Sequence, residues 1–168
     1  MNRKICVVTG SRAEYGLFYP ILIKIKESLV LDLQLITSSS HYSSELGSTY
    51  KQIEKDGFAI DEKIDNLLPS DEKSSIAKST GLATMLLADS FKQLNSDIVL
   101  LLGDRFETHA AATAALLMNI PIAHIHGGET TEGLIDEAVR HSITKMSHLH
   151  FTATDAYRNR VIQLGEIP

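Results

Sequence analysis

The residues best suited to chemistry are concentrated in one stretch in the second half of the chain. It combines His124, His126 and Glu129 with the pair Gly127 and Gly128, at an apparent turn from a strand into a helix. Imidazole and carboxylate groups can move protons near neutral pH, and glycine lets a ligand approach the backbone closely. Packing alone rarely requires this mixture, so we predict that the stretch forms part of an active site.

The helix expected after this turn carries charged side chains at helical spacing. Asp136 with Arg140, and Glu137 with His141, are each four residues apart. On a solvated face each pair would stabilise the helix by only about 0.2–0.5 kcal/mol, which is the ordinary alternative. Because the helix follows the glycine turn, its N-terminal end is also expected to face the same cleft as Arg12 and Asp104.

Two earlier loops offer further ionisable groups, each with a simpler alternative. Arg12 lies in a glycine-flanked loop without the sequence pattern of a P-loop or a dinucleotide-binding turn. It could clamp a phosphate, or it could pair with Glu14 on the surface. Asp104 beside Arg105 offers an acid/base carboxylate next to an anion-binding cation. Asp104 could equally cap the helix that follows.

The histidine spacing also admits a metal site as an alternative. His124 and His126 are two residues apart on a predicted strand, which would point both to one face, and His148 and His150 repeat the spacing. Metal-dependent hydrolases use such pairs in (β/α)8 barrels, which typically need about 250 residues. The chain has 168 residues, so we expect neither a metal nor another cofactor.

The segments that position these residues alternate between two hydrophobic periodicities. Apolar, β-branched runs predict strands at residues 5–8, 31–36, 98–102, 120–125, 149–153 and, less regularly, 58–64. Helical spacing predicts helices at residues 17–28, around 83–94, up to 118, around 135–146 and at 155–164. This alternation predicts an α/β fold, a Rossmann-like doubly wound parallel sheet with helices on both faces. The loops that follow its strands share one edge, where ligands bind.

Composition narrows the class of protein. With a formal net charge of -5 and no Lys/Arg cluster longer than two residues, the chain is not expected to bind nucleic acid. No apolar run approaches the roughly 20 residues that cross a bilayer. The first residues lack a cleavable signal, so we expect a cytoplasmic protein without a membrane partner. Cys6, the only cysteine, is expected to be a buried thiol.

Taken in order, these motifs resemble the hydrolysing UDP-N-acetylglucosamine 2-epimerases of sialic acid biosynthesis and their relatives that act on diacetamido sugars. The resemblance covers essentially the whole chain. It is carried by Thr9-Gly10-Ser11-Arg12-Ala13-Glu14-Tyr15-Gly16, Gly47-Ser48-Thr49-Tyr50, Gly103-Asp104-Arg105-Phe106-Glu107, His124-Ile125-His126-Gly127-Gly128-Glu129, Asp136-Glu137, Arg140-His141-Ser142-Ile143-Thr144-Lys145 and Gln163-Leu164-Gly165-Glu166.

The resemblance implies a two-domain architecture of the glycosyltransferase-B type. Residues 1–168 would form the amino-terminal Rossmann-like domain, and the second, UDP-binding domain would be absent from this chain. The substrate would be a UDP-sugar bound between the two domains. The resemblance also implies that the full-length protein is a homo-oligomer, either a dimer or a tetramer.

Roles of single residues are implied in the same way. Asp104 and Asp136 match acid/base carboxylates. Many family members carry glutamate where this chain has His126, so either His126 or Glu129 is implied as a further catalytic group. The side chains implied to bind the substrate are Arg12, His41, Arg105, Arg140 and His141.

The implied reaction removes the proton from C2 of the sugar and eliminates UDP, which leaves a 2-acetamidoglycal. Water then adds at C1 while C2 is protonated from the opposite face, giving a free sugar of manno configuration. The substrate is left open between UDP-N-acetylglucosamine and UDP-2,4-diacetamido-2,4,6-trideoxyglucose. The domain alone is expected to be inactive. There are two alternatives: the protein binds a sugar nucleotide without catalysis, or it transfers the sugar to an acceptor sugar.

Overall fold

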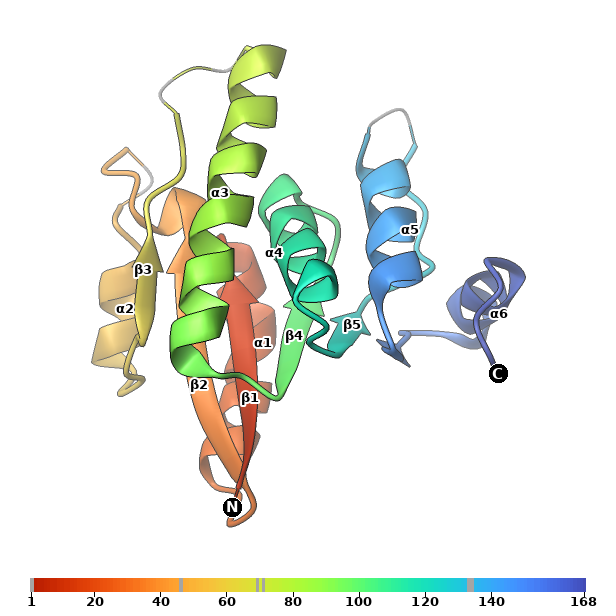
Figure 1. The fold of residues 1–168 in the computed structure, drawn as a ribbon, viewed down its shortest axis with the longest axis horizontal. Helices are drawn as coiled ribbons and strands as arrows, with labels where there is room; N and C mark the ends of the chain where they lie inside the picture. Colours follow the sequence, from red (N-terminus) through yellow and green to blue (C-terminus); the bar gives the residue numbers. More distant parts are fainter. Residues whose placement is uncertain (1, 46, 69, 71, 133–134) are drawn as a thin grey trace.

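Six parallel strands form the centre of the molecule, in the order β3-β2-β1-β4-β5-β6 (Figure 1). The computed structural model describes residues 2–45, 47–68, 70, 72–132 and 135–168. The strands are β1 (Arg3–Thr9), β2 (Leu31–Ser38), β3 (Glu62–Ile64), β4 (Ile98–Leu102), β5 (Ile122–Ile125) and β6 (Leu149–Phe151). This is the strand order of a Rossmann fold, so the prediction of a doubly wound α/β sheet is confirmed.

Helices cover both faces of the sheet (Figure 1). They are α1 (Arg12–Lys26), α2 (Tyr50–Lys55), α3 (Lys73–Leu94), α4 (Phe106–Leu117), α5 (Asp136–Met146) and α6 (Asp155–Gln163), with a 3-10 turn at Ser39–His41. The core on one face is filled by α3, α4 and α5, and the core on the other by α1 and α2. No helix among the described residues is long and apolar enough to cross a membrane.

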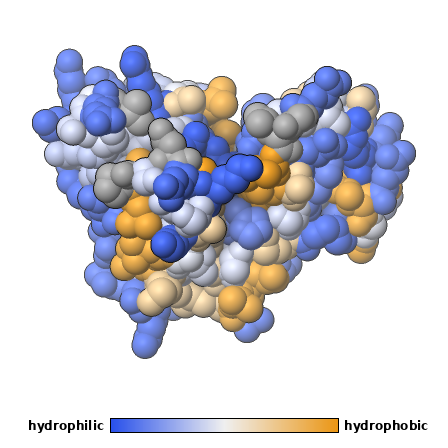
Figure 2. Space-filling model, turned by 90° about the horizontal axis from the view of Figure 1, so that it is seen from above, coloured by the Kyte–Doolittle hydropathy of each residue, from blue (hydrophilic) through white to orange (hydrophobic). Residues whose placement is uncertain are grey.

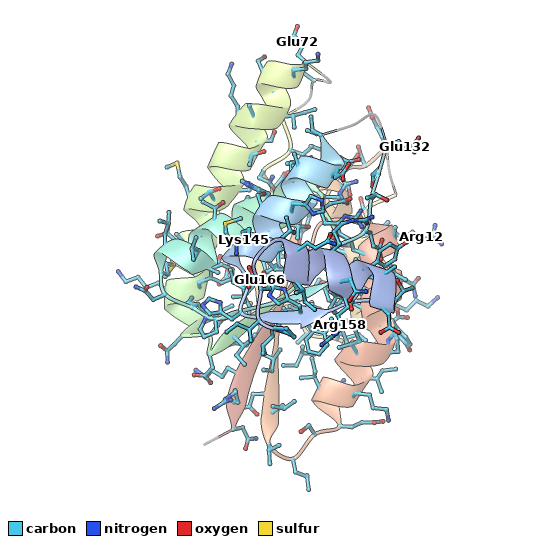
Figure 3. All side chains as sticks on the ribbon, turned by 90° about the vertical axis from the view of Figure 1, so that its right-hand side faces the viewer. Arg12, Glu72, Glu132, Lys145, Arg158 and Glu166 are labelled. Atoms are coloured by element: carbon cyan, nitrogen blue, oxygen red, sulfur yellow. The ribbon has the colours of Figure 1, made fainter. Side chains whose placement is uncertain are left out.

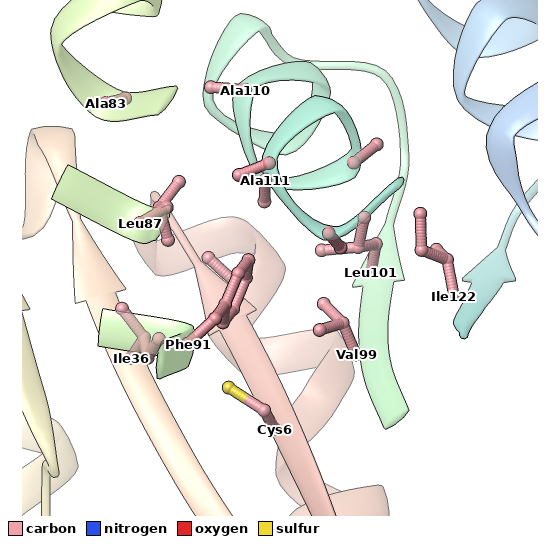
Figure 4. Close-up of a cluster of buried hydrophobic side chains, with 14 of the residues drawn as sticks. Cys6, Ile36, Ala83, Leu87, Phe91, Val99, Leu101, Ala110, Ala111 and Ile122 are labelled. Atoms are coloured by element: carbon pink, nitrogen blue, oxygen red, sulfur yellow. The ribbon is translucent and has the colours of Figure 1, made fainter. Parts of the chain in front are cut away.

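The central strands are buried on both faces, which explains why they read as continuous apolar runs. Side chains of β1 alternate, so that Cys6 enters the core under α3 and α4 while Val7 enters the core under α1. Figure 4 shows Phe91 from α3 close to Cys6 and Val99 in the first of these cores. Cys6 is fully buried, as predicted, and burial raises the pKa of its thiol to about 12.

The ends of several elements differ from the prediction for local reasons. Helix α1 begins at Arg12, not at residue 17, because the Ser11 hydroxyl accepts a hydrogen bond from the Glu14 amide at 3.3 Å and caps the helix earlier. The predicted strand at 58–64 contracts to the edge strand β3. Helix α2 was not predicted, since it is six residues long and buries only Ile53.

The order of the strands reverses between β1 and β4, because the chain first builds β2 and β3 on one side and then β4 to β6 on the other. At such a switch point the loops after the two neighbouring strands diverge and leave room for a ligand. Figure 2 looks onto this edge of the molecule, whose outline is indented and whose surface is mainly hydrophilic. The fold therefore places the loops after β1, β2, β4 and β5 at one site.

Candidate functional site

A buried arginine joins the loops after β4 and β5. Arg140, on α5, is 6% exposed, and its guanidinium contacts the Asp104 carboxylate and donates to Glu129 Oε2 at 2.8 Å. It also donates to the His126 carbonyl at 3.4 Å and to the Thr131 hydroxyl at 3.3 Å. Burial by itself would lower the pKa of Arg140, but the two carboxylates outweigh burial and raise it. Arg140 therefore holds two acids in fixed positions.

Glu129 connects this arginine to His126. The Nδ1 atom of His126 contacts Glu129 Oε1, while the other carboxylate oxygen accepts from Arg140. Burial favours a raised pKa for Glu129, but hydrogen bonds from His126 and Arg140 outweigh it and hold the pKa below its usual value. Glu129 is therefore an ionised group committed to two partners. The His126 side chain is 33% exposed, so its ring remains accessible from solvent.

The two histidines of the opening motif do not share a face, so that prediction is wrong. Strand β5 ends at Ile125, and His126 adopts a left-handed backbone with φ of 65°. His124 is fully buried, where Nε2 hydrogen-bonds to the Gly103 carbonyl at 2.8 Å and Nδ1 to the Thr144 hydroxyl at 3.3 Å. Burial lowers the pKa of His124 to about 4. His124 therefore ties β5 to β4 and α5 as a neutral ring.

Asp104 does not cap helix α4, which excludes the simpler alternative for this residue. The N-cap position belongs to Arg105, and no side chain caps the helix there. The Asp104 carboxylate instead contacts Arg140 from the next loop along the edge. Its side chain is 19% exposed, so the carboxylate is fixed by Arg140 and still open to the site.

Asp136 begins α5 and is half-buried. The predicted pair between Asp136 and Arg140 does not form, because Arg140 turns toward the β4 and β5 loops. The Asp136 carboxylate makes no hydrogen bond or ion pair with another residue that the structure describes. The other predicted pair on this helix, Glu137 with His141, does form, with His141 Nε2 3.4 Å from Glu137 Oε1. Among the described residues, Asp136 is thus the candidate acid whose carboxylate has no fixed partner.

A second cationic group lies at the switch point. Arg105 donates to both oxygens of Glu107, at 2.9 and 3.2 Å, and its Nε atom is 3.6 Å from Glu14. The exposed Arg12 does not pair with Glu14, which excludes that alternative. Figure 3 shows Arg12 at the outer side of the molecule. A hollow of about 410 Å³ is lined by Ser11, Arg12, Ala13, Ser40, Thr49 and Arg105.

His41 supports this hollow from within. It is fully buried, and its ring hydrogen-bonds to the Thr9 hydroxyl through Nε2 at 3.2 Å and to the Thr49 hydroxyl through Nδ1 at 2.7 Å. Burial, with a smaller effect of the Arg105 charge, lowers the pKa of His41 to about 4. In this arrangement His41 joins the loops after β1 and β2 as a neutral ring and does not line the hollow.

Sequence reasoning missed three buried polar groups that shape the site. Glu14 and Glu107 are only 6% and 1% exposed, although each stands in a motif that was noticed for its arginine. Asn66 accepts from the Ser39 amide and hydroxyl at 3.0 and 2.9 Å and so fixes the turn after β2. The spacing of Ser11 and Glu14, typical of a helix capping box, was the available signal for Glu14. No local pattern marks Asn66.

Comparisons with known proteins find related sequences over most of the chain. The family model described as UDP-N-acetylglucosamine 2-epimerase matches residues 23–168. A curated relative from Campylobacter jejuni, named GDP/UDP-N,N'-diacetylbacillosamine 2-epimerase (hydrolyzing), is 48% identical across 98% of this chain and 43% of its own length. A relative from Legionella pneumophila, named UDP-N,N'-diacetylbacillosamine 2-epimerase (hydrolyzing), is 43% identical across 99% of this chain and 44% of its own length.

Solved structures support the fold. The crystal structure of the UDP-GlcNAc 2-epimerase from Neisseria meningitidis bound to UDP-GlcNAc has a TM-score of 0.85 and 24% identity, and the match covers 98% of this chain and 43% of that one. The chain thus spans less than half the length of the curated relatives and solved structures described.

Proposed function

Because the chain belongs to the UDP-N-acetylglucosamine 2-epimerase family, we propose that it is the amino-terminal domain of a hydrolysing UDP-sugar 2-epimerase. The observation that carries this proposal is the network in which Arg140 holds Asp104 and Glu129 beside His126 at the ligand-binding edge of the sheet. A second domain, outside residues 1–168, would bind most of the UDP in the whole protein.

The first step of the proposed reaction occurs at C2 of the sugar. A carboxylate takes the C2 proton, and the bond between C1 and the diphosphate oxygen breaks so that its electron pair leaves with UDP. Asp104 is suited to this step because Arg140 fixes it while leaving it partly exposed. Asp136 remains the alternative base, since its carboxylate has no described partner. The cations Arg12 and Arg105 would stabilise the charge on the departing diphosphate.

The second step hydrates the resulting 2-acetamidoglycal. Water adds its oxygen at C1, and a proton is delivered to C2 on the face opposite to the one that lost it. The two faces of C2 need two proton-handling groups, or one group and a water. His126 suits the second role because its ring is accessible, and imidazole is the side chain that most often acts as a general acid or base. Glu129, already bound to Arg140, would orient His126.

The names of the two relatives favour a UDP-2,4-diacetamido sugar as the substrate. The alternative is UDP-N-acetylglucosamine, after which a Neisseria meningitidis relative 32% identical to this chain is named. The kcat/KM values of a full-length protein for the two UDP-sugars decide between them, and a preference for UDP-N-acetylglucosamine would overturn the diacetamido assignment.

The reaction itself is tested with a full-length protein in deuterium oxide. We expect UDP to be released together with a manno-configured sugar that carries deuterium at C2. Product without deuterium at C2 would exclude the elimination mechanism. Binding of UDP without any release from UDP-sugars would favour the non-catalytic binding module. Residues 1–168 alone are expected to release no UDP, because most of the UDP-binding surface would lie in the other domain.

A further inference from the structure

Two acids are buried beneath the switch point and take no part in the proposed proton transfers. Glu14 lies in the first turn of α1 and Glu107 in the first turn of α4, and both side chains are almost completely buried. Acids are rarely buried unless they are paired. Both reach the same cation, Arg105, which comes from the loop after β4.

The contacts within this cluster are unequal. Glu107 makes a two-pronged hydrogen-bonded pair with Arg105, at 2.9 and 3.2 Å. Glu14 Oε2 accepts from the Gly10 amide at 2.7 Å. Its Oε1 atom is buried without a hydrogen-bond partner in the part of the chain that the structure describes, and it is 3.6 Å from Arg105 Nε. Glu107 is therefore the hydrogen-bonded partner of the Arg105 guanidinium. Glu14, from α1, lies beside the guanidinium as a second, longer charge contact.

The charge of the cluster depends on Glu14. With both acids ionised, two carboxylates face one guanidinium and the cluster has a net charge of -1. With Glu14 protonated, the cluster is neutral. Burial, together with the neighbouring Glu107 charge, raises the pKa of Glu14 to about 7, although the Gly10 amide and Arg105 oppose the shift. Among the described residues, the other charged or titratable groups near Arg105 are Asp104, the neutral His41 and Arg12, which lines the same hollow.

The Arg105 side chain is 44% exposed, and it lines the hollow with Arg12, Ser11 and Ser40. We propose that Glu14 is a positioning residue that, with Glu107, fixes the Arg105 guanidinium at this hollow, and that the charge of Glu14 sets how strongly the hollow attracts the diphosphate of the nucleotide. The inference deepens the proposed function and rests on it for the identity of the anion.

The expected effect has a definite sign. As pH rises through about 7, Glu14 loses its proton, and the added negative charge weakens anion binding. The dissociation constant for UDP should therefore rise between about pH 6 and pH 8.5 in the wild type. We expect this rise to be roughly 3- to 10-fold larger than any rise measured for the variant Glu14→Gln. The variant keeps the shape and the acceptor for the Gly10 amide but has no proton to lose.

The test measures UDP binding by calorimetry in a full-length protein, across this pH range, for the wild type, Glu14→Gln and the control Glu27→Gln. Glu27 lies at the far end of α1 and pairs with the exposed Lys24, so its variant should follow the wild type. KM and kcat for the UDP-sugar are measured in parallel, and the Glu14→Gln effect should fall on KM.

Equal pH dependence in the wild type and Glu14→Gln would overturn the inference, as would an effect confined to kcat. A wild type that binds UDP with the expected pH dependence but releases no UDP from any UDP-sugar would contradict the proposed enzyme and leave this inference supported. If the protein turns over UDP-sugars but Glu14→Gln binds UDP with the same pH dependence as the wild type, the proposed enzyme is supported and the role of Glu14 is contradicted.

Discussion

The ion pair of Asp104 with Arg140 joins the loop after β4 to helix α5 across the edge of the sheet. The same guanidinium holds Glu129, so one cation fixes two acids that come from neighbouring loops. The backbones of the two loops are already joined beside Asp104, where the Gly103 amide donates to the Ile125 carbonyl at 3.1 Å, and Arg140 adds the link between their acidic side chains. The relative position of the candidate acids is therefore set by a tertiary contact.

The substitution Arg140→Met should destabilise the protein severely, because it leaves two partly buried carboxylates without their cation. We expect a loss of about 3–5 kcal/mol in the unfolding free energy of this domain. The loss should be smaller for Arg140→Lys, because lysine keeps the positive charge but lacks the planar guanidinium that donates to two carboxylates at once. Urea unfolding of a full-length protein measures both. The control is Arg158→Met, an exposed arginine on α6. Equal stabilities for Arg140→Met and the control would refute the role given to this arginine.

The substitution Asp104→Asn should separate catalysis from folding. Asparagine keeps an oxygen for Arg140 but cannot accept the C2 proton, so kcat should fall by about 10²- to 10⁴-fold with little change in melting temperature. Release of UDP is the measurement. Asp89→Asn, at an exposed position on α3, is the matched control and should leave kcat unchanged. Substantial turnover by Asp104→Asn would transfer the role of base to Asp136.

The roles of His126 and Glu129 are distinguished by replacing each residue with glutamine. His126→Gln should reduce kcat by about 100-fold or more if the ring delivers the second proton, whereas Glu129→Gln should reduce it by only about tenfold, because that residue orients the ring. Deuterium incorporation at C2 is measured beside kcat. The reverse ranking would make Glu129 the proton donor and His126 its support.

The fold and the convergence of the site were predictable because both depend on patterns within short segments. Apolar runs fixed the positions of β4 and β5, and a parallel sheet brings the ends of its strands to one edge. The partners of Arg140 were not predictable, because the local rule for residues four apart favoured Asp136. The structure instead pairs Arg140 with residues 36 and 11 positions away.

Backbone conformation accounts for the wrong prediction at the histidine pair. Strand alternation applied to His124 but ended one residue before His126, whose left-handed backbone turns its ring away from that face. Left-handed conformations are uncommon outside glycine and leave no clear signal in histidine. The buried acids Glu14 and Glu107 were missed for a related reason, since burial of a charge depends on a partner from another loop.

The buried ring of His124 should make the protein sensitive to acid. Its pKa is lowered to about 4 in the folded protein, so between about pH 6.5 and pH 4 only the unfolded chain binds the proton. Stability is then present above about pH 6.5 and is lost as pH falls, by up to about 3 kcal/mol for this residue. The pH dependence of urea unfolding should be weaker in His124→Gln. His148→Gln, at an exposed position, should follow the wild type, and an identical slope in all three proteins would contradict the assignment.

The substitution Gly128→Ala should disturb the site by moving helix α6. Gly128 has a φ of 78°, and an added Cβ atom would lie 2.3 Å from the Tyr157 backbone oxygen. Backbone strain and overlap both oppose alanine, so we expect a loss of about 2–4 kcal/mol in stability and a fall in kcat as Glu129 shifts. Gly81→Ala, in the middle of α3 with open space around it, should instead stabilise the protein by about 0.5–1 kcal/mol. Thermal unfolding and UDP release compare the two variants. If Gly128→Ala were as stable and active as Gly81→Ala, the turn after β5 would not depend on its contact with α6.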